Sequence, residues 1–283
     1  MVNINVEQGT QDWLELRRKS VTASDCACLM GVGFETPYQR WMKKITGEEE
    51  PVNDDMQRGK DLEPVARAEA ERIFETPFYP ETHIHAQNTW AMASLDGISP
   101  NGTIIEIKCP RSKGHEAARL GVIADYYIPQ LQWQMYVAEK EEVQFLSYCD
   151  GDLIPILVKR DQTYIDILVK LATGFYESLA TLTPPALTSK DVKEIVLDDG
   201  FEAAAAEWKA AKQILDTWEI AETDARKRLQ TYAKNGSVKG YGVKVLKSIR
   251  SGNVDYSSIP ELKNVDLDQY RKKPSEIYRI SLD

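Results

Sequence analysis

The sequence predicts an α/β fold, in which a mixed sheet is flanked by helices and followed by a C-terminal helical arm and a small sheet-containing cap. Short runs of alternating apolar and polar residues occur between residues 78 and 108 and between 143 and 159, and such runs indicate strands. Apolar residues at helical spacing lie on both sides of these runs. Pro184 and Pro185 mark a boundary. We therefore expect one domain over residues 1–183 and a second region over 184–283.

The first part of the chain is expected to be helical. Residues 9–30 have the pattern of two short helices, the second capped by Thr22 or Ser24. Thr36 and Pro37 are typical of a helix start, and this helix is expected to continue to about residue 46. A longer helix is predicted over residues 56–74, and its expected buried stripe consists of Leu62, Val65, Ala66, Ala70 and Ile73.

The sheet is expected to begin after Pro77. Strands are predicted at residues 78–85, 90–94 and 103–108, with turn signals at Asp96-Gly97 and Asn101-Gly102. Pro110 ends the third strand. The following elements are expected to be helices near 114–120 and 129–137, strands at 143–148 and 154–159, and a helix at 163–182.

The region after Pro185 has a different character. Residues 201–233 are rich in alanine and charge and have helical periodicity, which predicts a helical arm. Alternation returns at residues 238–249 and 275–281, around a loop at 253–256, so we expect a small sheet-containing cap.

Composition limits the function classes. The 283 residues are 42% hydrophobic and 28% charged, which is typical of a folded globular protein. No apolar run approaches the roughly 20 residues that cross a bilayer, and the N-terminus lacks the features of a signal peptide, so we expect a cytoplasmic protein. The four cysteines show neither zinc-site nor disulfide spacing, and neither these nor an iron–sulfur cluster is expected. A net charge of −9 argues against a large DNA-binding surface but not against a confined basic channel.

The residues that indicate chemistry are Asp96, Glu106 and Lys108. Side chains alternate along a strand, so Glu106 and Lys108 lie on one face while Ile107 points to the core. A hairpin ending at Asp96 would bring its carboxylate beside Glu106, and two adjacent carboxylates favour a hard divalent cation. We expect Mg²⁺, held by Asp96, Glu106 and the carbonyl of Ile107, with Lys108 stabilising negative charge at phosphorus. Taken alone, the same residues also fit an ordinary hairpin with a solvated, charge-paired face.

Several further sequence motifs, found in the same order as in a known family, favour the metal site over the ordinary hairpin. Residues 13–17 (WLELR) and 21–24 (VTAS), Arg58-Gly59-Lys60 with Glu63, residues 106–110 (EIKCP) and residues 127–132 (YIPQLQ) resemble the phage-type alkaline exonucleases typified by the exonuclease of phage lambda. This family lies within the PD-(D/E)xK nuclease superfamily and has a restriction-endonuclease-like core. The resemblance spans roughly residues 9–180. Leu95 stands where the superfamily name has proline, a departure that is common in such proteins.

The resemblance implies roles for further residues. It implies that Arg17 and Ser24 bind a DNA phosphate, that Glu63 assists at the metal site, and that Gln130 and Gln132 lie against the catalytic centre. Gln130 and Gln132 are two positions apart on a helix and point in different directions, so at most one is expected to face the metal. From the residues alone, Arg17 is also compatible with a helix-surface arginine, Ser24 with a cap and Glu63 with a solvated side chain.

The resemblance also implies an activity. Members of the family digest linear double-stranded DNA from a 5′ end with Mg²⁺, for which Mn²⁺ is a possible substitute. They leave 3′ single strands and work with a single-strand annealing protein in phage recombination inside a bacterial host. A homo-oligomer, possibly a ring of three subunits, is implied. The alternatives are a site- or structure-specific endonuclease with the same chemistry and a non-catalytic DNA-binding module.

Other candidate residues favour structural roles. His83 and His85 share a strand face without a third ligand nearby, and we expect surface or strand-pairing residues. Most of the four tryptophans at positions 13, 41, 90 and 133 are expected in the core rather than stacked on bases.

Overall fold

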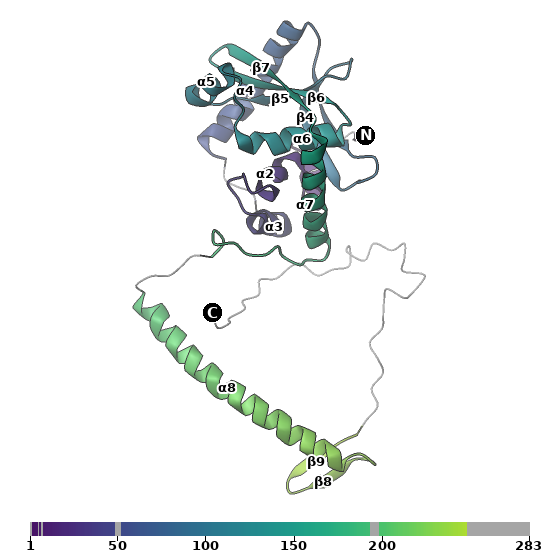
Figure 1. Cartoon of the computed structure of the whole chain (residues 1–283), viewed down its shortest axis with the longest axis vertical. Coiled ribbons are helices and arrows are strands. Elements are labelled where there is room, and N and C mark those ends of the chain that lie inside the picture. Colours follow the sequence, from purple (N-terminus) through teal and green to yellow (C-terminus); the bar gives the residue numbers. More distant parts are fainter. Residues whose placement is uncertain (1, 5, 7, 49–51, 193–197, 248–283) are drawn as a thin grey trace. The chain divides into compact units, whose positions relative to one another are not determined.

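The computed structural model describes residues 2–4, 6, 8–48, 52–192 and 198–247 (Figure 1). Contacts divide the chain into two compact units, Met1–Lys193 and Glu194–Asp283. The first unit contains the sheet and the predicted site residues. The second contains the long helix α8 and a short hairpin.

A mixed sheet forms the centre of the first unit. In spatial order its strands are β1 (Val2–Ile4), β3 (Tyr79–Ile84), β4 (Ala91–Ile98), β5 (Ile104–Lys108), β6 (Glu142–Cys149) and β7 (Asp152–Lys159), and β2 (Val21–Thr22) pairs with β4. The β5–β6 and β2–β4 pairs are parallel and the other pairs are antiparallel. The predicted α/β fold with a mixed sheet and flanking helices is confirmed.

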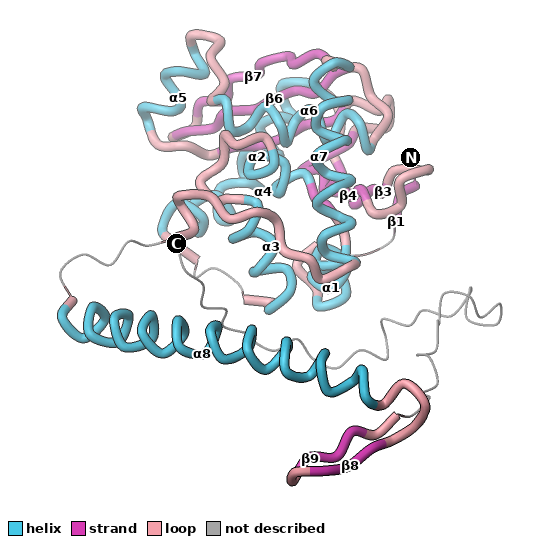
Figure 2. Tube along the Cα trace, turned by 60° about the horizontal axis from the view of Figure 1, so that its bottom comes forward, coloured by secondary structure: helices cyan, strands magenta, loops and turns pink. Residues whose placement is uncertain are grey.

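Helices cover both faces of this sheet (Figure 2). The first unit contains α1 (Gln11–Lys19), α2 (Cys26–Leu29), α3 (Pro37–Thr46), α4 (Asp54–Phe74), α5 (Ser112–Arg119), α6 (Ile128–Val137) and α7 (Gln162–Ala180), with short 3-10 turns η1 (Ala23–Asp25) and η2 (Asp125–Tyr127). Helix α6 packs on β4 and β6 and against α2 and α7, whereas α4 packs on β5, β6 and β7. The sheet therefore has a separate core on each face.

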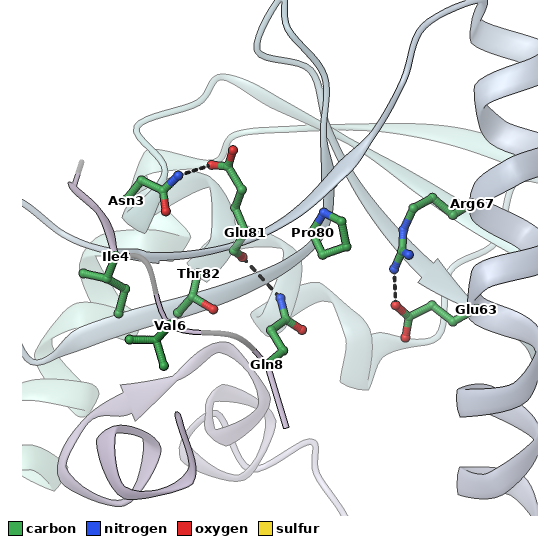
Figure 3. A pocket seen from close by; sticks show the side chains of 9 residues that line it. All are labelled: Asn3, Ile4, Val6, Gln8, Glu63, Arg67, Pro80, Glu81 and Thr82. Atoms are coloured by element: carbon green, nitrogen blue, oxygen red, sulfur yellow. Dashed lines mark hydrogen bonds and ion pairs between the residues drawn. The ribbon is translucent and has the colours of Figure 1, made fainter. Parts of the chain in front are cut away.

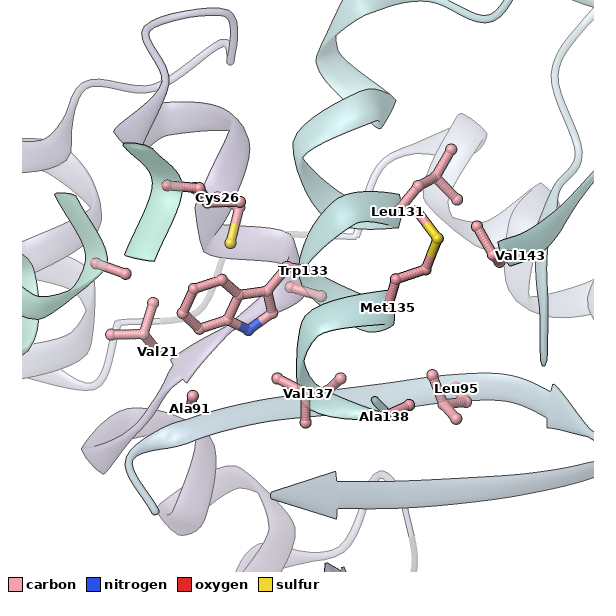
Figure 4. Close-up of a cluster of buried hydrophobic side chains, with 14 of the residues drawn as sticks. Val21, Cys26, Ala91, Leu95, Leu131, Trp133, Met135, Val137, Ala138 and Val143 are labelled. Carbon is pink, nitrogen blue, oxygen red and sulfur yellow. The ribbon is translucent and has the colours of Figure 1, made fainter. Parts of the chain in front are cut away.

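The alternation of β5 separates these two cores. Ile104 belongs to the cluster around Trp133 of α6, which also contains Val21, Leu131 and Met135 (Figure 4). Ile105 and Ile107 belong to the cluster with Ala66 and Ala70 of α4. Glu106 shares its face with Ile104, so the chain places this carboxylate on the α6 side of the sheet.

The structure corrects the predicted position of Asp96. Strand β4 continues through Asp96 and Gly97 to Ile98, so the Asp-Gly dipeptide is not a turn. The hairpin turn follows it, where Gly102 has φ +87° and its N–H donates to the carbonyl of Ser99. Asn101-Gly102, the second turn signal, therefore makes the hairpin.

Helix α4 is also buried over a narrower stripe than predicted. Ala66 and Ala70 are fully buried, whereas Val65 is 50% and Ile73 40% exposed. The two alanines, four positions apart, let the helix approach the sheet closely. For His83 the strand-pairing alternative is confirmed, because it pairs with Asn3 and Ala93 in the sheet. It is buried, and its Nε2 lies 2.7 Å from Glu81 Oε2.

The second unit consists of α8 (Asp199–Tyr232) and a hairpin of β8 (Val238–Gly240) and β9 (Val243–Val245). The predicted loop at 253–256 and strand at 275–281 lie outside the described residues. None of the helices in the described part of the chain has the length and apolar character needed to span a bilayer.

Candidate active site

Strand β4 contains a bulge at Asp96. Tyr79 of β3 pairs with Ile98, but Glu81 pairs with Leu95, so β4 has one residue more than β3 over this stretch. Leu95 and Ile98 both lie in the core on the α6 side, while Gly97 faces Phe78 and Ile105 on the α4 side. The extra residue of β4 therefore lies between Leu95 and Ile98, in the stretch that contains Asp96.

The three predicted residues of the catalytic centre lie together. Asp96 Oδ2 accepts a hydrogen bond of 2.7 Å from the backbone N–H of Ile107, the residue between Glu106 and Lys108. Lys108 Nζ forms an ion pair with Glu106 Oε1. The Glu106 side chain is 2% exposed and that of Lys108 24% exposed. The ammonium therefore connects a buried carboxylate to the surface.

The cluster has two carboxylates but a single ammonium group, so its negative charge is only partly neutralised. Burial, and then the negative charge of Glu106, raise the pKa of Asp96 well above its usual range. Burial disfavours the charged form of Lys108, but the carboxylates of Glu106 and Asp96 outweigh this effect and raise its pKa. Lys108 Nζ also lies 5.3 Å from the ring centroid of Tyr127, whose pKa burial raises to about 12.

Helix α6 supplies two amides to Glu106. Gln130 Nε2 donates to Oε1 and Gln134 Nε2 donates to Oε2, each over 2.5 Å. Gln132 faces elsewhere, because its Nε2 donates to the carbonyl of Lys159 and its Oε1 accepts from the N–H of Asp161. As expected, only one of Gln130 and Gln132 faces the carboxylates, and Gln132, which the resemblance placed against the catalytic centre, instead holds the backbone of the β7–α7 junction. Gln134 was not predicted, although its i, i+4 spacing from Gln130 places both on one helix face.

Glu63 reaches the site through an arginine that the sequence analysis missed. Glu63 forms an ion pair with Arg67, one helical turn later on α4. Arg67 Nε donates a hydrogen bond of 2.7 Å to the backbone carbonyl of Asp96. The i, i+4 spacing of Glu63 and Arg67 is the sequence signal that indicates this pair.

Arg17 of α1 and Ser24 of η1 lie side by side. Arg17 Nη2 donates to Ser24 Oγ over 2.9 Å, and the guanidinium lies 4.4 Å from the ring centroid of Trp13. Burial lowers the pKa of Arg17, and the charge of Asp25 partly offsets this. A guanidinium beside a hydroxyl is a suitable pair of donors for a phosphate oxygen.

A buried ion pair fixes the backbone around Arg17. Lys44 Nζ lies 2.8 Å from Asp25 Oδ2 and donates to the carbonyls of Arg17 and Ser20. The same Asp25 oxygen accepts from the N–H and hydroxyl of Thr22. Burial disfavours the Asp25 carboxylate, but the charges of Lys44 and Arg40, together with the hydrogen bonds from Lys44 and Thr22, outweigh this effect and hold the pKa of Asp25 below its usual range.

Hydrogen bonds link the arginine pair to the carboxylate cluster. The indole N–H of Trp13 donates to Ser94 Oγ over 3.1 Å, and the carbonyl of Ser94 accepts from Gln134 Nε2. Trp13 therefore connects the helix that carries Arg17 to the strand that carries Asp96. The two predicted groups of site residues belong to one connected region of the first unit.

The oxygen ligands available here fit a Mg²⁺ ion that also binds water and substrate phosphate better than they fit a metal ion bound only by protein side chains. Within the described residues, no three Asp, Glu, His or Cys side chains gather as a metal site. Asp96 and Glu106 form a pair, and Mg²⁺ is usually bound by one or two carboxylates together with water and substrate phosphates. The raised pKa of Asp96 also fits a site that gains stability from an added cation.

A depression of about 790 Å³ adjoins this region (Figure 3). Glu63 and Arg67 line one side of it, and the N-terminal segment with Gln8 and the strand β3 with Glu81 line the other. Asp96, Glu106 and Lys108 are not among its lining residues. The depression therefore borders the carboxylate cluster on the Glu63 side.

Part of the first unit matches a known family. Residues 12–141 match the model of the YqaJ-like viral recombinase domain. This stretch is a YqaJ-like viral recombinase domain. It contains Arg17, Ser24, Glu63 and the cluster of Asp96, Glu106 and Lys108, and the predicted family is confirmed.

Two solved structures are similar to this chain and support the family assignment. The alkaline exonuclease LHK-Exo from Laribacter hongkongensis is 29% identical and has a TM-score of 0.55, and the alignment covers 61% of this chain and 94% of that chain. A crystal structure of LHK-Exo in complex with dAMP gives the same identity and coverage with a TM-score of 0.56. A search of curated proteins found no match. The family and these neighbours indicate a nuclease that acts on DNA, with a PD-(D/E)xK fold.

Proposed function

We propose that the protein is a magnesium-dependent exonuclease that degrades linear double-stranded DNA from the 5′ end and leaves 3′ single strands. The observation that carries this proposal is the cluster of Asp96, Glu106 and Lys108, which lies within the recombinase domain. Two carboxylates and an ammonium on adjacent strands are the groups that phosphodiester hydrolysis with a divalent cation requires.

Asp96, Glu106 and the carbonyl of Ile107 are the groups that would hold Mg²⁺, or Mn²⁺ in its place. A bound Mg²⁺ supplies positive charge that polarises the scissile phosphate and favours ionisation of water. Gln130 and Gln134 fix the orientation of Glu106. Arg67 fixes the backbone of Asp96 and orients Glu63.

Lys108 acts on the reacting phosphate. Its partly exposed ammonium is placed to donate a hydrogen bond to the attacking water and to the negative charge that develops at phosphorus. Its raised pKa keeps it protonated at neutral and alkaline pH, so its role is electrostatic.

Arg17 and Ser24 would bind the 5′ phosphate of the DNA end. Their hydrogen bond and their connection to the carboxylate cluster through Trp13 and Ser94 support one continuous path for the strand. Stepwise cleavage releases mononucleotides, and LHK-Exo has been crystallised with one, dAMP. The resemblance further supports a single-strand annealing protein as a partner in recombination.

The test is digestion of linear duplex labelled at either end, with Mg²⁺ or with EDTA. We expect loss of the 5′ label as mononucleotide, only with Mg²⁺, and a stable 3′ strand. Lys108→Met is expected to lower the rate by at least about a hundredfold, because electrostatic stabilisation of the transition state is lost. Lys113→Met, on the exposed surface of α5, is the matched control and should digest at the parental rate.

Other outcomes contradict this proposal in identifiable ways. Cleavage of covalently closed circular DNA would indicate an endonuclease with the same chemistry. Unchanged digestion by Lys108→Met would show that the cluster is not the catalytic centre. Binding of duplex ends without any cleavage, at all divalent cation concentrations, would indicate a DNA-binding module.

A further inference from the structure

Helix α8 has an apolar stripe for which the proposed nuclease function has no use. The helix has 34 residues, none of them buried. Trp218 is 69% exposed, Tyr232 76%, Phe201 56% and Leu215 50%. A helix of this length, with large apolar side chains in solvent, indicates a surface that another chain covers.

The apolar residues of α8 follow a seven-residue repeat. One set of positions contains Phe201, Trp208, Leu215, Glu222 and Leu229, and a second set, three residues later each time, contains Ala204, Ala211, Trp218, Ala225 and Tyr232. Alternating steps of three and four are the a and d pattern of a coiled coil, and three to four repeats are enough to indicate one. The repeat runs through almost all of α8.

We propose that α8 binds α8 of a second copy of this chain, and that the two helices pair antiparallel along these apolar stripes. The sizes of the stripe residues support this orientation. When two copies overlap fully, Trp208 lies opposite Ala225, Leu229 opposite Ala204, and Leu215 opposite Trp218. Large residues then fit against small ones in two of these layers, as close packing requires.

A parallel pair gives poorer layers. It places Trp218 against Trp218 and Ala211 against Ala211, so a crowded layer and an empty one lie close together. It also places the carboxylates of Glu222 against each other in the seam, where like charges are costly. In the antiparallel pair Glu222 lies opposite Ala211, and it keeps its ion pair with Arg226 on its own helix.

The charges beside the stripe also fit an antiparallel pair. Beside the apolar stripe, Glu207 of one helix lies near Arg228 of the other, and Lys212 of one lies near Glu219 of the other. Because the pair of helices is symmetric, each of these contacts occurs twice. No like charges meet at these flanking positions. In a parallel pair the only attractive contact between flanking charges of the two helices would be Glu207 with Lys212. Complementary charge therefore indicates a second copy of the same helix rather than an unrelated apolar partner.

The first experiment measures the mass of the full-length chain in solution. We expect twice the 32.1 kDa of one chain from sedimentation equilibrium, and 32.1 kDa for the double variant Leu215→Glu/Trp218→Glu. Ile220→Glu is the matched control, because Ile220 is 66% exposed but lies on the opposite side of the helix, so this variant should remain a dimer. Digestion of linear DNA by both variants at the parental rate would show that the recombinase domain is folded.

A monomeric parent chain would overturn the proposal and would indicate that the stripe is covered by another segment or protein. A dimer or a three-copy ring that the double variant leaves intact would overturn it as well, since assembly would then use another surface.

The second experiment tests orientation by charge reversal. Glu207→Lys is expected to raise the dimer dissociation constant about tenfold, because two attractive pairs become repulsive. Adding Arg228→Glu should restore the parental value only in the antiparallel arrangement. Rescue by Lys212→Glu instead of Arg228→Glu would indicate a parallel pair and would overturn the stated orientation.

Discussion

Glu106 is buried and charged, and its neighbours explain how the fold tolerates it. One carboxylate oxygen receives Lys108 and Gln130 and the other receives Gln134. A buried carboxylate without such partners would cost several kcal/mol. The same contacts orient Glu106 toward Asp96, so the residues that stabilise the charge also position it for a cation.

Arg17→Ala tests the proposed phosphate site. Arg17 donates to Ser24, and removing its guanidinium should take away the preference for a 5′-phosphorylated end while leaving cleavage in place. We expect the ratio of rates on phosphorylated and hydroxyl ends to fall about tenfold, consistent with one charge-assisted hydrogen bond. Arg18→Ala, on the exposed side of α1, is the control. A parent protein that digests both ends equally well would remove the basis of this prediction.

Gly97→Ala tests the geometry of the bulge. A Cβ at Gly97 would lie 2.7 Å from Phe78 Cβ and 2.9 Å from the side chain of Ile105, so the strand must move. We expect a loss of about 1–3 kcal/mol in the free energy of unfolding, together with slower DNA cleavage because Asp96 is the adjacent residue. Urea denaturation measures the first effect and the linear-duplex digest measures the second.

Gly174→Ala is the matched control for Gly97→Ala. Gly174 lies within α7, and a Cβ there meets nothing within 4 Å. Alanine should stabilise the helix by about 0.5–1 kcal/mol. Equal stability of the Gly97 and Gly174 variants would contradict the described packing of β4.

The residues of the candidate site were predictable to different degrees. Alternation along a strand correctly paired Glu106 with Lys108 on one face. Asp96 lies near them as predicted, but it lies within strand β4 and not at a turn. Gly97 was interpreted as part of a turn, whereas a glycine inside a strand also indicates a bulge, and the register of β3 against β4 shows that bulge. Gln132 matched the family motif, but α6 presents Gln130 and Gln134 instead, which a count of helical positions favours.

At the scale of elements, local signals located the helices well. Thr36 caps α3, where its hydroxyl accepts from Gln39 N, and Pro37 begins the helix as predicted. Strands β1 and β2 were missed because they are only three and two residues long, too short to show alternation. Their pairing depends on β3 and β4, which lie far away in the sequence.

The junction of α1, η1 and α3 depends on the Asp25–Lys44 pair, which gives a prediction with a defined pH dependence. Lys44→Met leaves the Asp25 carboxylate buried without its closest cation, and such losses cost about 3–5 kcal/mol. In the parent, the pKa of Asp25 is lowered on folding. The pair's stabilisation is therefore present at neutral pH and is lost as the pH falls below about 4, toward the lowered folded pKa.

In Lys44→Met the pKa of Asp25 should rise instead, so the destabilisation should be greatest at pH 7 and shrink as the pH falls and the carboxyl takes up a proton. Urea denaturation of the parent and the variant between pH 4 and pH 7 measures this. A difference that stays constant over that range would show that Lys44 contributes packing and not charge. Lys43→Met, on the same helix but paired with Glu35, gives the comparison for a more exposed cation.

At the scale of the whole molecule, net charge was a poor guide to function. The chain carries −9, yet Arg17, Arg67 and Lys108 lie within the small region that the proposed function assigns to DNA. A few confined cations imply that DNA binding weakens only moderately with salt, because each phosphate contact contributes a slope of about −0.9 in log–log form.

The last prediction concerns the division of the chain into two units. Both hydrophobic clusters consist of residues between Val21 and Leu179, and every proposed site residue lies in the unit Met1–Lys193. A fragment of residues 1–193 should therefore fold cooperatively and digest linear duplex at a rate within about threefold of the full chain, since no catalytic group is removed. It should also fail to associate through α8, because it lacks that helix. Loss of cleavage by a folded fragment would show that the second unit contributes to the active site.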